Sequence, residues 1–149
     1  MVTSFTDIDT YWDRGKDIVI ARCLVVQSGL KGRTSGRLHR VDVEVIRPLK
    51  GNCAAGKKTI ATIYEMLPGQ NYLLYSLGGS TEDIDFLAIP DLSVVEIPSG
   101  MSLTALEGKP SKDQVAAIFS ARLQYLRQIA KGLNAERTLL EKATAQKSP

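Results

Sequence analysis

Six short runs of β-forming residues, separated by glycine, proline and polar segments, constrain the fold of this chain more than any other feature. The runs cover residues 17–26, 41–45, 58–64, 71–76, 84–89 and 92–97. In the second run Val41, Val43 and Val45 alternate with Asp42 and Glu44, the period-two pattern of a half-buried strand. Closely spaced strands joined by turns predict a small antiparallel barrel or a curled sheet.

A short helix is expected before the first strand. Ile8, Tyr11 and Trp12 are spaced to share one helical face, and Gly15 supplies a stop. The first strand, residues 17–26, is almost continuously apolar, so we expect both of its faces to be covered.

A helical segment is expected after the strands. Ser111 and Gln114 match a capping box at its start. Its apolar stripe comprises Val115, Ile118, Phe119, Leu123, Leu126, Ile129 and Leu133. Gly132 is expected to end or kink the helix, and Asn134 to cap a second one. The stripe is interpreted as a core face packed on the barrel, with a partner-binding or dimer face as the alternative.

Length and order of elements indicate one domain of 149 residues. We expect the α+β class, mainly β, with an OB-like β-barrel and short helix over 1–100. A linker and C-terminal helices over 101–149 should belong to the same compact domain. No apolar run reaches the length of a membrane span, so no membrane insertion is expected.

Three motifs give the chain a family resemblance. They read VEVIRPLKG at 43–51, TIATI at 59–63 and PGQNYLLY at 68–75, and DIVIAR at 17–22 looks like the family's first strand. Over about residues 5–100 the chain resembles the OB-like barrel of the tissue inhibitors of metalloproteinases and netrin-type modules. The resemblance implies a small antiparallel barrel, closed or partly open, and a non-catalytic interaction module with a protein partner. The inhibitors chelate zinc through an N-terminal cysteine, and because this chain has none before Cys23, that mechanism is not implied.

The two cysteines, Cys23 and Cys53, admit two interpretations. They are a candidate disulfide if the chain is exported, or two buried small apolar side chains. The start of the chain shows no basic segment followed by an apolar one, so no signal peptide is visible. The resulting prediction is an extracellular or periplasmic location if a leader was trimmed, with the compartment otherwise undetermined.

The first long loop is basic. Its candidate binding residues are Lys31, Arg33, Arg37, His39 and Arg40. Loops at this position bind oligonucleotides in OB-folds, but such binding also needs aromatic stacking platforms, which the neighbouring strands hardly offer. We interpret the segment as a solvated basic loop. Single-stranded nucleic-acid binding through residues 28–40 is the alternative, although a net charge of +3 does not by itself require it.

No set of residues predicts catalysis. His39 is the single histidine, and nothing marks a nucleophile elbow or an oxyanion site. Two cysteines and one histidine are too few for a four-ligand zinc site. Glu82, Asp83 and Asp85 lack the spacing of a calcium loop. The sequence therefore predicts no enzymatic activity, no metal and no cofactor.

Overall fold

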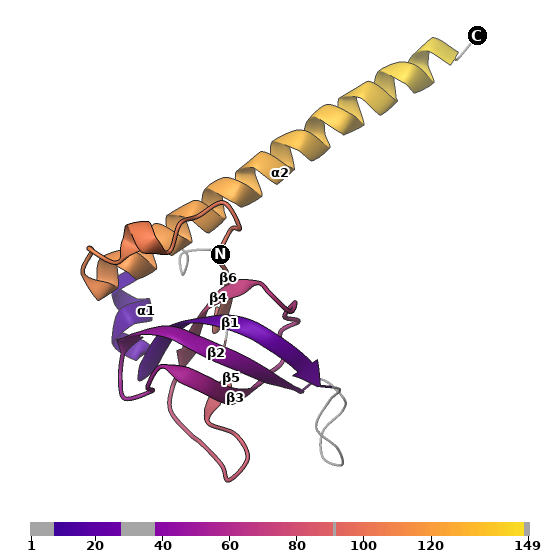
Figure 1. Cartoon of the computed structure of the whole chain (residues 1–149). Coiled ribbons are helices and arrows are strands. Elements are labelled where there is room, and N and C mark those ends of the chain that lie inside the picture. The colour runs from indigo at the N-terminus through magenta and orange to yellow at the C-terminus, as the bar shows by residue number, and fades with distance from the viewer. Residues whose placement is uncertain (1–7, 28–37, 91, 148–149) are drawn as a thin grey trace.

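An N-terminal helix, a six-stranded sheet and a long C-terminal helix make up the fold (Figure 1). The computed structural model describes residues 8–27, 38–90 and 92–147. The strands are β1 (Asp17–Gln27), β2 (His39–Lys50), β3 (Gly56–Thr62), β4 (Asn71–Ser76), β5 (Phe86–Ala88) and β6 (Val94–Glu96). The helices are α1 (Ile8–Arg14), the short 3-10 helix η2 (Thr104–Leu106) and α2 (Ser111–Lys147). The predicted α+β class is confirmed.

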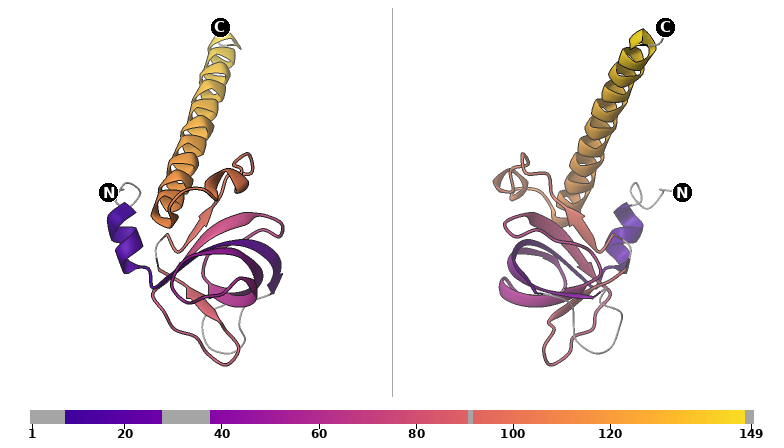
Figure 2. Two further views of the ribbon diagram at one scale, coloured as in Figure 1. Left: turned by 60° about the vertical axis from the view of Figure 1, so that its left-hand side comes forward. Right: turned by 90° about the vertical axis from the view of Figure 1, so that its right-hand side faces the viewer.

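The sheet has the order β5-β3-β2-β1-β4-β6 and curls into a half-barrel (Figure 2). Neighbouring strands are antiparallel except β3 and β5, which are parallel. The expectation of an antiparallel sheet is therefore wrong at this edge. After β4 the chain crosses to the other edge of the sheet, where β5 pairs with β3. This crossover connection brings β5 beside β3 in the parallel direction.

Strand bounds differ from the predicted runs in three ways, the first of which is that β3 lies two residues earlier than the run at 58–64. The run at 71–76 is confirmed as β4, whereas β5 and β6 are shorter than predicted. Strand β2 is longer, because it continues through Pro48 to Lys50. Pro48 faces Val19 beside a shift in the β1–β2 register, and an irregularity of this kind tolerates a residue without an N–H.

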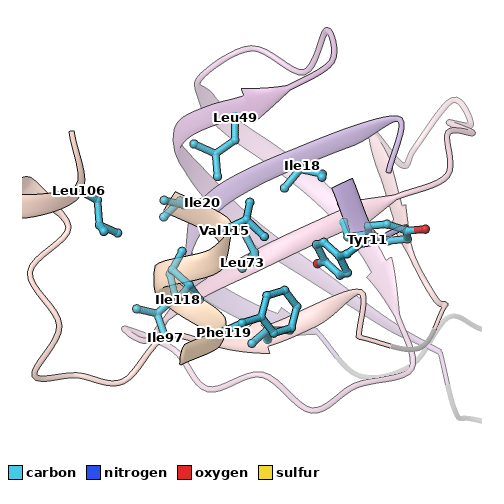
Figure 3. Packing of buried hydrophobic residues seen from close by; sticks show 12 residues of the cluster. Tyr11, Ile18, Ile20, Leu49, Leu73, Ile97, Leu106, Val115, Ile118 and Phe119 are labelled. Atoms are coloured by element: carbon cyan, nitrogen blue, oxygen red, sulfur yellow. The ribbon is translucent and has the colours of Figure 1, made fainter. Parts of the chain in front are cut away.

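Two hydrophobic clusters lie on opposite faces of the sheet. One fills the half-barrel and includes Val19, Ala21, Val43, Ile60, Leu74 and Phe86. The other lies between the sheet and the helices and includes Tyr11, Ile20, Leu73, Val115, Ile118 and Phe119 (Figure 3). Successive residues of β1 alternate between the two clusters, so both faces of this strand are covered, as predicted.

Helix α1 closes one end of the second cluster through Tyr11. The Tyr11 hydroxyl donates a hydrogen bond of 3.0 Å to the Leu92 carbonyl. Its ring centroid lies 4.7 Å from that of Tyr75 and 4.8 Å from that of Phe119. Burial raises the pKa of Tyr11 well above its usual value, and it raises the pKa of Tyr72 and Tyr75 as well.

These tyrosines predict alkaline destabilisation. A tyrosine whose pKa is higher in the folded state than the unfolded value of about 10 contributes stability to the fold. That contribution is fully present below about pH 10 and is lost as pH rises through the folded-state pKa. We expect the free energy of unfolding, measured with urea, to fall between about pH 8 and about pH 11. Tyr11→Phe should lose roughly 0.5–1.5 kcal/mol at the lower pH with its hydrogen bond and show a smaller alkaline fall. Equal pH dependence in both proteins would contradict the role given to Tyr11.

The C-terminal segment is one continuous helix, contrary to the prediction of two. Gly132 and Asn134 both lie inside α2, where the Thr138 hydroxyl donates to the Asn134 carbonyl at 3.0 Å. One glycine costs a helix only about 1 kcal/mol, and good helix formers surround this one. None of the described helices is both long and apolar enough to cross a membrane.

The start of α2 is held by tertiary contacts in place of the predicted capping box. The Gln114 side chain donates to the Lys109 carbonyl at 2.9 Å and accepts from the Arg47 guanidinium. Arg47 also donates to the Leu103 carbonyl at 3.0 Å, tying β2 to the segment before α2. These contacts bury the Gln114 side chain.

Only the first turns of α2 pack on the sheet. Val115, Ile118 and Phe119 are buried, whereas every described side chain from Gln124 to Lys142 is exposed. The helix projects away from the half-barrel (Figure 1). The expectation that Leu126, Ile129 and Leu133 belong to a core face is therefore wrong. At 1.5 Å per residue the segment beyond Leu123 extends roughly 35 Å.

Candidate functional site

The basic residues predicted as a binding loop are only partly within the described structure. Lys31, Arg33 and Arg37 lie outside the described residues, and His39 begins β2. The Arg40 guanidinium donates to the Asp83 carbonyl at 3.2 Å and lies 3.8 Å from its carboxylate. Binding of nucleic acid through residues 28–40 stays a prediction.

The two cysteines lie near the same core cluster as free thiols. Cys23 is buried inside the half-barrel, and Cys53, between β2 and β3, packs against that cluster. The predicted disulfide is not formed in this structure. Burial raises the pKa of both thiols above the usual value. Cys23 is buried, as the other interpretation of the sequence expected, whereas Cys53 is only partly buried.

A hollow of about 290 Å³ lies at the place where α2 leaves the sheet. Its lining residues are Tyr64, Glu65, Leu67, Tyr72, Val94, Glu96 and Arg122. We call this hollow the notch. One wall belongs to the edge strand β6, another to the segment between β3 and β4, and Arg122 comes from α2. The notch thus joins the sheet edge to the base of the projecting helix.

Hydrogen bonds hold the walls of the notch in place. Arg122 donates to the Glu96 carboxylate at 3.0 Å, and both side chains are partly buried. The Tyr72 hydroxyl accepts from the Leu67 amide at 2.8 Å. The Tyr64 hydroxyl also joins the two walls, because it accepts from the backbone amide of residue 92 at 3.2 Å. The Leu67 side chain remains exposed at the rim.

A stripe of exposed apolar side chains continues outward from the notch along α2. We call Leu126, Ile129, Leu133 and Leu140 the outer stripe. All four are exposed, Leu133 at 60%. Tyr125 and Leu139 are exposed beside it, and the Arg122 guanidinium lies 5.7 Å from the centroid of the Tyr125 ring. Exposed apolar side chains that adjoin one another in this way typically mark an interaction surface.

Other hollows among the described residues are lined by mixed charges. One of about 350 Å³ contains Asp42, Lys57, Lys58 and Asp85. Its carboxylates are already engaged, since Asp42 accepts from the Thr59 hydroxyl at 3.1 Å and Asp85 from the Thr59 amide at 2.9 Å. Within residues 8–27, 38–90 and 92–147, no three His, Cys, Asp or Glu side chains form a group suited to a metal ion.

The apolar spacing predicted that Leu126, Ile129 and Leu133 share one helical face, but it did not predict the exposure of that face or include Leu140 in it. The sequence did not indicate the notch, because its lining residues come from separate parts of the chain. The signal for a projecting helix was present, because the apolar spacing continues past Gly132 to Leu140. A 3.6-residue period shows which face is apolar and does not show what covers it.

The chain was also compared with known proteins. It matches none of the protein families and none of the curated proteins with which it was compared.

Proposed function

We propose that this chain is a non-catalytic protein-interaction module whose partner binds the outer stripe and the notch. The observation that carries the proposal is the continuity of one helical face. Val115 and Phe119 bury that face against the sheet, and Leu126, Ile129 and Leu133 continue it, exposed, for several turns. The exposed part of this helical face has the same apolar character as the part that packs on the sheet. An apolar helix face of this kind is suited to binding the surface of another protein.

The resemblance to netrin-type and metalloproteinase-inhibitor barrels supports the same proposal. The Leu-Lys-Gly sequence at 49–51 ends β2, and the tyrosine-rich run at 71–76 forms β4, as the resemblance implies. We propose on this basis that the half-barrel is an OB-like barrel and that the module works outside the cytoplasm. In that family the barrel presents a surface to a protein partner and performs no chemistry.

A photo-reactive benzophenone side chain at position 133 tests the proposal. We expect irradiation in the cells that make this chain to give one discrete protein adduct. The matched control is the same group at Lys131, which lies on the opposite side of α2 and should give none. Leu126→Asp should abolish the adduct at position 133, because it places a charge in the same apolar face. Equal labelling from both positions, or none from position 133, would contradict the proposal.

A further inference from the structure

We infer that the partner of the outer stripe is a second copy of this chain, bound through α2 in the antiparallel direction. This inference rests on the proposed function, and it names the occupant of the same surface. Four features of the described residues carry it: the spacing of the stripe, the charge within it, the distribution of basic residues along α2, and the position of the notch.

The three leucines of the outer stripe are spaced symmetrically about Leu133. Leu126 lies seven residues before it and Leu140 seven residues after it. A two-fold axis through Leu133 therefore brings Leu126 of one copy against Leu140 of the second, and Leu133 against Leu133 of the second copy. Two-fold interfaces require this self-complementarity, since each contact must occur twice.

Glu136 distinguishes a protein surface from a lipid surface. It occupies a seam position of the apolar face, three residues after Leu133, and Arg137 follows it. A helix lying in a membrane interface would have to bury that carboxylate at the acyl boundary, which is unfavourable. In the antiparallel pair Glu136 lies at the level of Ala130 of the second copy, at the flank of the two-helix contact, which stays open to water.

The basic residues favour the antiparallel over the parallel direction. Between Gln114 and Ala135 the helix carries Arg122, Arg127 and Lys131 and no acidic residue. Parallel pairing would set Arg122 against Arg122 and Glu136 against Glu136. Antiparallel pairing separates the like charges and places the basic part of one helix beside the mixed-charge part of the other.

The notch lies where the second helix ends. With the two-fold axis at Leu133, residue 144 of the second copy falls opposite Arg122, which lines the notch. The last turns of the second helix therefore cover the notch, including the exposed Leu67 at its rim. A helix face about 10 Å wide and roughly 35 Å long, with the notch added, remains below the ~800 Å² per partner of a standard interface. We therefore expect a micromolar dimer.

Sedimentation equilibrium of the whole chain measures this association. The monomer mass is 16.3 kDa, and the expected dimer mass is twice that value. Leu133→Asp brings two carboxylates together at the two-fold axis, so we expect at least a tenfold rise in the dissociation constant. Gln124→Asp places the same charge on the opposite side of α2 and should leave the dimer intact. A wild-type chain that stays monomeric at high concentration, or equal effects of both variants, would overturn the inference.

Engineered cysteines test the direction of pairing. A mixture of Leu126→Cys and Leu140→Cys proteins should cross-link to a dimer on oxidation, and Leu126→Cys alone should not. The unsubstituted chain is the control for cross-linking through the native Cys53. Cross-linking of Leu126→Cys alone would indicate a parallel pair and overturn the inference.

Failure of the inference and failure of the proposed function give different results. A purified chain that stays monomeric, together with a position-133 adduct to a different protein in cells, overturns the second copy and retains the interaction module. If the group at position 133 forms an adduct with lipid alone, or forms no adduct either in cells or in the purified chain, both the second copy and the interaction module are overturned.

Discussion

Ile118→Ala is expected to lower the free energy of unfolding by roughly 2–5 kcal/mol, because truncation of a fully buried isoleucine removes apolar contacts and leaves a cavity. The Ile118 side chain is 0% exposed, in the cluster that joins α2 to the sheet. For a domain of this length the loss corresponds to a fall in Tm of roughly 5–15 °C. Urea unfolding followed by circular dichroism, in dilute protein, provides the measurement.

Ile129→Ala is the matched control for that variant. It makes the same substitution eleven residues further along the same helix, at a side chain that is 40% exposed. We expect its effect on the unfolding of dilute protein to stay within about 0.5 kcal/mol, as for most surface substitutions. Similar losses at the two positions would mean that α2 packs along its whole length, and the outer stripe would then not exist as a surface.

The contrast between these isoleucines shows what the sequence can and cannot predict. Both belong to one apolar period, and that period correctly predicts a helix and the face that carries Val115 and Phe119. The period is the same on either side of Leu123, so it cannot distinguish a face covered by the sheet from one that extends past its edge. Where the cover ends depends on the width of the sheet and on the point at which α2 crosses it.

In the sheet, too, some features follow from local sequence patterns and others depend on contacts between residues far apart in the chain. The alternation in β2 is a local signal, and it was confirmed. The parallel pairing of Ile60 with Phe86 joins residues far apart in sequence, and no local signal specifies its direction. The role of Arg47 was missed for the same reason, since its partners Leu103 and Gln114 come from a distant segment.

A disulfide was an open alternative for Cys23 and Cys53, and the structure explains why sequence alone did not decide it. The two thiols approach the same cluster from β1 and from the β2–β3 connection. Proximity to a shared cluster depends on how the sheet curls, which the spacing of two cysteines does not encode.

Gly51→Ala is expected to cost roughly 2–5 kcal/mol, more than the same change at any other described glycine in a turn of this sheet. Gly51 has φ +92°, and a Cβ there would lie 2.2 Å from the Asp17 carboxylate and 2.3 Å from the Lys16 carbonyl. A left-handed backbone costs an L-residue about 1–2 kcal/mol, and overpacking adds about 1–3 kcal/mol. The displaced chain should also weaken the 2.9 Å hydrogen bond from the Asn52 amide to Asp17.

Gly69→Ala separates the two contributions, because Gly69 has nearly the same backbone angle, φ +86°, and no atom within 4 Å of an added Cβ. We expect it to lose only the backbone cost of about 1–2 kcal/mol in urea unfolding. The excess loss of Gly51→Ala over Gly69→Ala then measures how closely the end of β2 approaches the start of β1. Equal losses would mean that the corner after Lys50 yields freely, and the approach at Gly51 would then not constrain the curl of the half-barrel.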